Sequence, residues 1–81
     1  MTVTVLVFST LRKVVGQDAL SIALPESCDV ADLLERLYAD YPSLAEWDAQ
    51  LLVAVDQDYA TRGTELSDGQ EVAIMPPVQG G

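Results

Sequence analysis

The sequence predicts an α+β domain in which one main helix covers one face of a mixed β-sheet. Segments that alternate apolar and polar residues, rich in valine, stand toward both ends of the chain, and one segment with helical spacing lies between them. The order strand, strand, helix, strand, short strand, strand is that of a helix packed on a sheet. With 81 residues, the chain has room for one such domain.

The first strand is expected over residues 2–9. Its three valines alternate with other residues and are expected to face the core. On the opposite side the strand begins polar but ends with Leu6 and Phe8, which is unusual for a face in contact with solvent. A short helical turn is expected over residues 11–15, ended by Gly16 in a left-handed conformation.

A second strand is expected over residues 19–24, closed by Pro25. The main helix follows, because Asp29 is a good N-cap and apolar residues then recur at helical spacing over residues 30–41. Pro42 disfavours the helical conformation at the residue before it and ends the helix.

The second half of the chain contains patterns that predict short strands separated by turns. Residues 43–50 are expected to be irregular or to form a single turn, with Trp47 as an anchor. Strands are expected over residues 51–55, 59–60 and 71–75.

This order of elements is that of the β-grasp fold, the architecture of ubiquitin. In that topology the first and last strands are neighbours in the centre of the sheet. We therefore expect a β-grasp domain of residues 1–75 and an extended, mobile tail of residues 76–81 that leaves from the middle of the sheet.

The charge balance argues against a nucleic-acid partner. The chain has thirteen acidic and four basic residues, for a formal net charge of −9. Contacts with phosphate groups need clustered lysine and arginine. The acidity fits a solvated surface and also steering toward a basic protein partner. The longest apolar stretch is too short to span a bilayer, and no signal peptide is apparent. A soluble, cytoplasmic protein without a membrane partner is expected.

The residue inventory excludes most catalytic arrangements. The chain has no histidine, which rules out Ser-His-Asp and Cys-His catalysis, and no cluster of histidine and cysteine offers metal ligands. The single cysteine, Cys28, is expected to be a small, partly buried filler. Asp56 and Asp58 are interpreted as turn residues rather than ligands of a hard cation. No stand-alone catalytic residue and no metal site are expected.

The last six residues, Pro-Pro-Val-Gln-Gly-Gly, remain as the place where chemistry is expected. Two prolines stop the last strand and extend the backbone. Gly80 and Gly81 have no Cβ, so they can approach closely inside another protein's active site. The carboxylate of Gly81 is inert until it is activated, for example as an acyl-adenylate. The alternative is a frayed end in which glycine is merely tolerated.

Several segments resemble one family, the small, sulfur-carrying subunit of molybdopterin synthase. Residues 5–16 read V-L-V-F-S-T-L-R-K-V-V-G, which is similar to the family signature F-A-x-x-R-E-x-x-G. Residues 51–55 resemble its third strand. Residues 66–73 read L-S-D-G-Q-E-V-A, and with the P-P-V-Q-G-G of residues 76–81 they are similar to the family ending L-x-D-G-D-E-V-x-x-x-P-P-V-x-G-G. The resemblance covers essentially the whole chain.

The resemblance implies a cycle of sulfur transfer. An E1-like adenylyltransferase would adenylate Gly81 with ATP, and a sulfur donor protein would convert the acyl-adenylate to a thiocarboxylate. Val78, Gln79 and Gly80 would enter a pocket of the large synthase subunit. There the sulfur would pass to a cyclic pyranopterin phosphate to form the molybdopterin dithiolene. Two small and two large subunits would form a heterotetramer, and no cofactor would be bound permanently.

Phe8, Tyr59 and Met75 match positions that the family uses against its large subunit. The chain departs from the family pattern at Asp56, where asparagine is usual, and at Ser9, where alanine is common. Two groups of alternatives remain. One is a sulfur carrier for thiamine or tRNA thiolation, or a ubiquitin-like modifier. The other is a β-grasp binding module with an inert tail.

Overall fold

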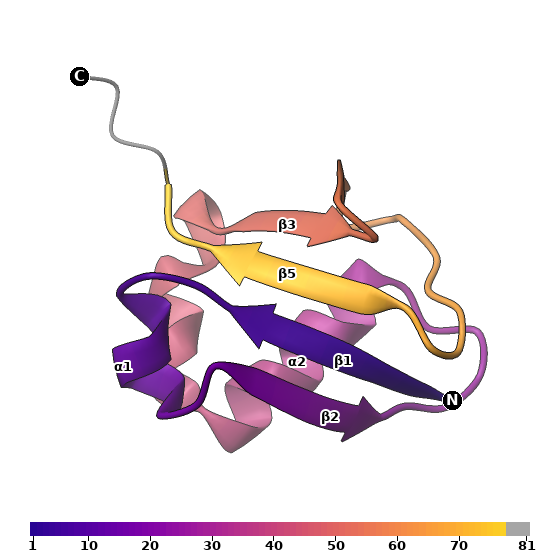
Figure 1. Cartoon of the computed structure of the whole chain (residues 1–81), viewed down its shortest axis with the longest axis horizontal. Coiled ribbons are helices and arrows are strands. Elements are labelled where there is room, and N and C mark those ends of the chain that lie inside the picture. Colours follow the sequence, from indigo (N-terminus) through magenta and orange to yellow (C-terminus); the bar gives the residue numbers. More distant parts are fainter. Residues whose placement is uncertain (78–81) are drawn as a thin grey trace.

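The structure, a computed structural model, describes residues 1–77; residues 78–81 lie outside the described part. A five-stranded sheet carries its helices on one face (Figure 1). The elements are β1 (Thr2–Val7), α1 (Leu11–Val15), β2 (Ala19–Ala23), α2 (Val30–Asp40), the 3₁₀ helix η1 (Pro42–Gln50), β3 (Leu52–Val55), β4 (Asp58–Tyr59) and β5 (Glu71–Met75).

The sheet is mixed, with the strand order β2-β1-β5-β3-β4. β1 and β5 are parallel neighbours in its centre, and the other pairs are antiparallel. The predicted α+β class, the β-grasp order and the central position of the first and last strands are therefore confirmed.

The core lies between the sheet and α2. Val3 and Val5 of β1 have no exposed surface, and Val7 is 3% exposed, so the alternation of valines identified the buried face. Four apolar residues of α2 pack against them: Val30, Leu33, Leu34 and Leu37. Each fully buried aliphatic side chain contributes about 1.5–3 kcal/mol to folding. This layer holds β5, and with it the root of the tail, in place.

The N-terminal cap of α2 and the C-terminal cap of α1 form as the sequence predicts. The side chain of Asp29 accepts a hydrogen bond from the backbone N–H of Asp32 at 2.9 Å, and the Asp32 side chain accepts one from the Asp29 N–H at 3.0 Å. This reciprocal capping box satisfies two N–H groups that the helix leaves without partners. At the end of α1, Gly16 adopts φ +86°, as expected for a left-handed cap.

The prediction for residues 43–50 was wrong. The segment from Pro42 to Gln50 is a continuous 3₁₀ helix, not an irregular stretch. A 3₁₀ helix has three residues per turn, so residues three apart lie on one side. Leu44 is fully buried and Trp47, three residues later, packs partly buried against the same core. That spacing was present in the sequence, but a single pair three residues apart occurs in α-helices as well and does not identify a 3₁₀ helix.

Four strands also differ from expectation by one or two residues: β2 ends at Ala23 instead of residue 24 and β3 begins at Leu52 instead of residue 51, and the other two are β1 and β4. β1 ends at Val7 rather than Ser9, because Ser9 has φ +57° and turns the chain into α1. The short strand β4 is residues 58–59, one residue earlier than predicted. It follows a turn in which Asp56 and Gln57 both have positive φ, +49° and +76°.

Candidate functional site

The root of the tail lies at the end of the central strand β5. Met75 is the last residue of β5, and Pro76 and Pro77 follow it directly. Figure 1 shows that β5 delivers this root to one end of the sheet, beside the connection from β1 to α1. The predicted reactive and inserted residues lie outside the described part: Val78, Gln79, Gly80 and Gly81.

The sheet face opposite the helices is apolar near this root. Paired residues of neighbouring strands share a face. Leu6 pairs with Ala73, Ala73 with Ala54, and Ala54 with Tyr59. These four residues therefore form one row that crosses β1, β5, β3 and β4. Tyr59, at the edge, is 76% exposed.

A second apolar row lies one step closer to the tail. The backbone N–H of Phe8 donates to the carbonyl of Ile74 at 3.2 Å, which continues the pairing of β1 with β5 and sets Phe8 beside Met75. Met75 in turn pairs with Leu52. Phe8 is 46% exposed. Phe8 and Tyr59 are the large hydrophobic residues of the described chain that stand exposed.

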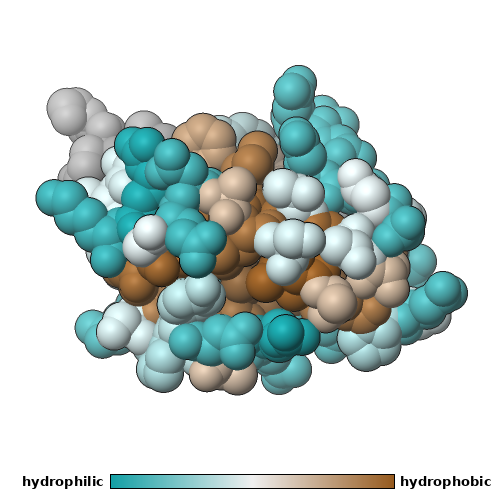
Figure 2. Space-filling view, turned by 60° about the horizontal axis from the view of Figure 1, so that its bottom comes forward, coloured by the Kyte–Doolittle hydropathy of each residue, from teal (hydrophilic) through white to brown (hydrophobic). Residues whose placement is uncertain are grey.

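Without Ala54, which is buried, these rows form an apolar patch that consists of Leu6, Phe8, Leu52, Tyr59, Ala73 and Met75. The same face is polar at its other end, where Thr4 pairs with both Ser21 and Glu71. Figure 2, turned so that the β2 edge comes forward, shows hydrophobic surface exposed between hydrophilic side chains. Exposed apolar surface with a polar rim is typical of protein interfaces. The predicted interface residues Phe8, Tyr59 and Met75 thus share one face.

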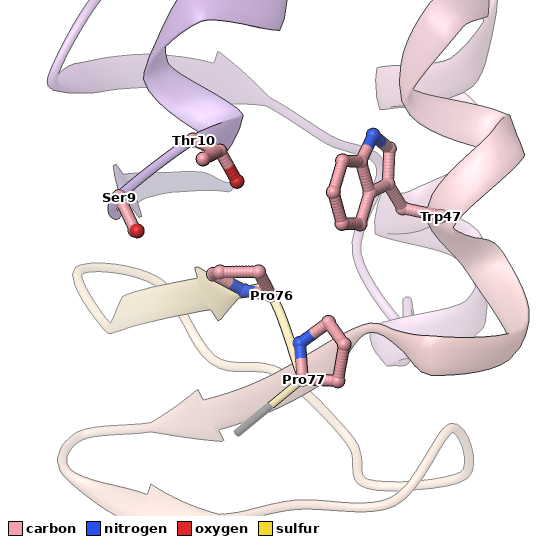
Figure 3. A pocket seen from close by; sticks show the side chains of 5 residues that line it. All are labelled: Ser9, Thr10, Trp47, Pro76 and Pro77. Atoms are coloured by element: carbon pink, nitrogen blue, oxygen red, sulfur yellow. The ribbon is translucent and has the colours of Figure 1, made fainter. Parts of the chain in front are cut away.

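A cavity lies at the tail root, on the helix side of the sheet. Its volume is about 270 Å³, and its lining residues are Ser9, Thr10, Trp47, Pro76 and Pro77. Figure 3 shows the Trp47 ring on one side, the two hydroxyl residues opposite it and the prolines below. The cavity joins three parts of the chain that are distant in sequence.

The apolar patch itself contains no charged residue, and the arginines of the chain are paired elsewhere. Three arginines form ion pairs with carboxylates: Arg12 with Asp18 at 3.6 Å, Arg36 with Asp40 at 3.3 Å, and Arg62 with Asp48 at 2.8 Å. Since no residue of the patch is charged and the chain carries −9 overall, the patch is a neutral surface on an acidic protein. A basic surface around an apolar centre would complement it.

Asp48 is the centre of a small polar network. It accepts hydrogen bonds from the hydroxyl of Tyr38 at 2.5 Å and from the guanidinium of Arg62 at 2.8 Å. These two bonds hold the pKa of Asp48 below its usual range. Partial burial, reinforced by the hydrogen bond to Asp48, raises the pKa of Tyr38 above its usual range. The network ties η1, which carries Trp47, to α2 and to the loop after β4.

Two further findings concern the described residues. Within residues 1–77, no helix is long and apolar enough to cross a membrane. In the same part of the chain, no three His, Cys, Asp or Glu side chains form a group that could hold a metal ion. Asp56 instead accepts hydrogen bonds from the Glu71 N–H at 3.0 Å and the Gln70 side chain at 3.1 Å. Cys28 is buried, more completely than the partly buried filler that the sequence predicts.

Comparison with known proteins identifies the family. The ThiS family matches residues 5–81. The chain belongs to the ThiS family. The match includes the second half of β1, all of β5 and the Gly-Gly ending.

Curated relatives resemble the chain over 93% or more of their own length. The molybdopterin synthase sulfur carrier subunit of Escherichia coli is 40% identical over 98% of this chain and 99% of its own. The protein of the same name from Caenorhabditis elegans is 32% identical over 100% and 99% of the two chains. The human one is 30% identical over 98% and 93%. The predicted resemblance is thus confirmed.

Solved structures show the same fold. SAMP1 from Haloferax volcanii has a TM-score of 0.88 at 25% identity, with both chains covered completely. A chain from the complex of subunits 1 and 2 of the Helicobacter pylori molybdopterin-converting factor has a TM-score of 0.72 at 24% identity, again over both whole chains. These solved structures therefore share the β-grasp fold of this ThiS family member.

Sequence reasoning found the apolar patch but missed the cavity. The patch was visible because Leu6 and Phe8 interrupt the polar side of a strand. The cavity depends on the left-handed turn at Ser9, and serine gives no strong signal for positive φ. The spacing of Leu44 and Trp47 was the one signal that could have placed an aromatic wall there.

Proposed function

We propose that the chain is the sulfur carrier of molybdenum cofactor biosynthesis, with its sulfur held on the C-terminal carboxylate of Gly81. The observation that carries this proposal is the family match over residues 5–81, together with relatives named as molybdopterin synthase sulfur carrier subunits along their full length. The fold supports it, because the central strand β5 leads straight into the tail beside an exposed apolar patch.

The chemistry begins with activation of an inert carboxylate. An oxygen of the Gly81 carboxylate attacks the α-phosphorus of ATP, and pyrophosphate leaves, which forms the acyl-adenylate. This step takes place in an E1-like adenylyltransferase. A sulfide-level sulfur nucleophile from a donor protein then attacks the acyl carbon, and AMP leaves with its electron pair. The product is a thiocarboxylate with one sulfur in place of one oxygen. The chain supplies the electrophile and its partners supply the catalytic groups.

Sulfur delivery takes place in the large subunit of molybdopterin synthase. Val78, Gln79 and Gly80 enter its active site. The thiocarboxylate sulfur attacks a carbon of a cyclic pyranopterin phosphate and displaces an oxygen, and water then cleaves the acyl–sulfur bond. The sulfur stays on the pterin and Gly81 returns to the carboxylate; two such transfers supply the two sulfurs of the dithiolene. The apolar patch, with Phe8, Tyr59 and Met75, packs against the large subunit and holds the tail root at the entrance. The patch is neutral and exposed near the root, as such a contact requires. All these steps take place in the cytoplasm. Two copies of the chain and two of the large subunit form a heterotetramer.

Intact-mass spectrometry tests the carrier role. The chain is incubated with an E1-like adenylyltransferase, ATP and a sulfur donor, beside a variant that lacks Gly81. The wild type is expected to gain the mass of one sulfur minus one oxygen, and the shortened variant is expected to keep its mass. An unchanged wild type, in the presence of an adenylyltransferase active on its own carrier, would overturn the proposal.

A second candidate in the same chemical class is a protein modifier or a carrier for another thiolation pathway. SAMP1, the small archaeal modifier protein 1, shares the fold at a TM-score of 0.88 and 25% identity. This likeness favours the modifier. Affinity capture separates the two. The proposed function predicts retention of a pterin-binding large subunit, whereas a thiazole synthase partner or covalent conjugates of the chain would favour the second candidate.

A further inference from the structure

The strand β2 forms one edge of the sheet (Figure 1). Where it pairs with β1, the backbones of Met1 and Leu24 bond to each other in both directions at 2.7 Å, and the Val7 N–H donates to the Asp18 carbonyl at 2.8 Å. In an antiparallel pair, every second residue exchanges hydrogen bonds with the partner strand. The even-numbered residues from 18 to 24 therefore bond to β1, and the backbone N–H and C=O groups of residues 19, 21 and 23 point outward from the sheet.

Two residues of this edge keep their outward backbone groups available. The guanidinium of Arg36, on α2, donates to the Ala23 carbonyl at 3.0 Å. Within residues 1–77, the outward groups of Ala19 and Ser21 have no protein partner. Both side chains are small and exposed, so another strand can approach the edge closely.

The strand β2 also lacks the features that protect natural edge strands, which are short length, charge, proline and bulges. It has five residues, A-L-S-I-A, and its pairing with β1 runs in one continuous register. The opposite edge of the sheet, β4, has two residues, and one of them is Asp58. Of the two edges, β2 is the one built to accept a further strand.

The β2 edge is complementary to itself in one antiparallel register. If Ala19 of one copy pairs with Ser21 of a second copy, these residues exchange all their outward N–H and C=O groups, two bonds for each pair. The Ala23 carbonyl, which Arg36 already contacts, is not needed. In this register Leu20 of one copy lies opposite Leu20 of the other on the buried face. The arrangement has a twofold axis, as most dimers do.

The charges at the two ends of the edge are complementary in the same register. It places Asp18 of one copy opposite Ile22 of the other, next to the Ala23 carbonyl where Arg36 lies. Asp18 shares a face with Ile22, because residues four apart in an extended strand point to the same side. The side chains of Asp18 and Arg36 are 83% and 47% exposed, so each copy can offer a carboxylate to the guanidinium of the other. Such exposed pairs contribute little energy but favour one register.

We propose that the β2 edge binds a second copy of this chain, with Ala19 of each copy paired to Ser21 of the other, so that one sheet runs through both copies. The interface is small, and the dimer therefore forms at high protein concentration. The edge is uncharged, and at physiological salt the repulsion between two chains of −9 is screened beyond about 8 Å. Since β1 separates β2 from β5, the tail root lies outside the contact (Figure 1).

Sedimentation velocity at physiological salt, up to millimolar protein concentration, measures the association. Ser21→Pro removes an outward N–H that the fold does not use, a position at which edge strands tolerate proline. We expect the wild type to dimerise and Ser21→Pro to dimerise at least about 10-fold more weakly, because each copy loses a hydrogen bond and meets the proline ring. Ser21→Ala keeps the N–H and should dimerise like the wild type. Far-ultraviolet circular dichroism establishes that each variant is folded.

Two results of this measurement would overturn the proposal. One is a wild type that stays monomeric up to millimolar concentration. The other is a folded Ser21→Pro that dimerises as tightly as Ser21→Ala.

Disulfide cross-linking tests the register without the proline variant. In a Cys28→Ser background, which removes the single native thiol, Ala19→Cys and Ser21→Cys are mixed in equal amounts and oxidised. In the proposed register, the Cα atoms of residue 19 and residue 21 of different copies lie about 5.5 Å apart, within reach of a disulfide. Two copies of the same variant place their cysteines about 8 Å apart, beyond that reach.

Intact-mass spectrometry distinguishes the mixed dimer from the two homodimers. We expect the mixed dimer to exceed the share that random pairing gives. Products in random proportion, or no cross-linked product, would contradict the register and with it the proposed contact.

The contact goes beyond the proposed function and is tested separately from it. Ser21→Pro should gain sulfur as the wild type does, because β2 carries neither the tail nor its root. If the wild type gains sulfur but stays monomeric, the contact is wrong and the carrier role stands. If it dimerises through β2 but gains no sulfur, the carrier role is wrong and the contact stands.

Discussion

Replacing Phe8 with aspartate tests whether the apolar patch binds the large subunit. Phe8 is 46% exposed in the free chain. An aromatic side chain presents about 200 Å² of surface, so about 90 Å² of Phe8 is open to a partner. At about 25 cal/mol per Å², covering that surface is worth about 2.3 kcal/mol. Since about 1.4 kcal/mol corresponds to a tenfold change in affinity, we expect Phe8→Asp to raise the Kd about 50-fold.

The loss of folding free energy, estimated in the same way, is small enough for the variant to fold. The buried half of Phe8 contributes at most about 2.7 kcal/mol, and this is an upper bound because the unfolded chain is partly compact. A domain of this size has a stability of about 4–12 kcal/mol. Phe8→Asp should therefore unfold at a lower temperature but remain native at 25 °C.

Isothermal titration calorimetry against the large subunit measures the effect. Ala39→Asp adds the same negative charge at an exposed position of α2, on the other face of the sheet from the patch, and serves as the control. Binding of folded Phe8→Asp as tight as that of Ala39→Asp would refute the interface. An unfolded Phe8→Asp variant would mean that Phe8 belongs to a minor core rather than to an interface.

Three further predictions concern stability and are measured by urea unfolding. Gln57→Gly should stabilise the chain by about 0.5–1 kcal/mol, because φ is +76° at this position in a turn that favours glycine; a loss of stability would contradict this. Asp29→Ala should destabilise it by about 1 kcal/mol through loss of the α2 cap, and an unchanged midpoint would count against the capping box. Tyr38→Phe should destabilise it by about 1 kcal/mol at pH 7. Because the pKa of folded Tyr38 lies above the unfolded value of about 10, that contribution is present below pH 10 and is lost at higher pH. The difference between wild type and Tyr38→Phe should therefore narrow above pH 10, and a constant difference would contradict the argument.

Much of the fold could be predicted because its signals are local. The alternating valines of β1 and the helical spacing of α2 each identify a buried face without reference to the rest of the chain. The cap at Asp29 and the left-handed Gly16 are likewise set by neighbouring residues. The apolar patch needed one further step, the pairing of β1 with β5, which follows from the β-grasp order.

The 3₁₀ helix and the cavity, which the sequence did not predict, depend on tertiary contacts. The 3₁₀ helix η1 is stabilised by buried Leu44 and by bonds from Tyr38 and Arg62 to Asp48, which lie 10 and 14 residues away. Its own sequence has little helical periodicity. The cavity at the tail root needs η1, the turn at Ser9 and the prolines to be placed together, and no single segment indicates that.

The most direct test of the account follows the sulfur itself. The chain is charged with radioactive sulfur on Gly81, purified, and mixed with the large subunit and cyclic pyranopterin phosphate. We predict that the label leaves the chain, which returns to the mass of the carboxylate, and that it is found in the dithiolene of the pterin product. Label that stays on the chain in the presence of a bound and active large subunit would contradict the claim that Gly81 carries sulfur for this synthesis.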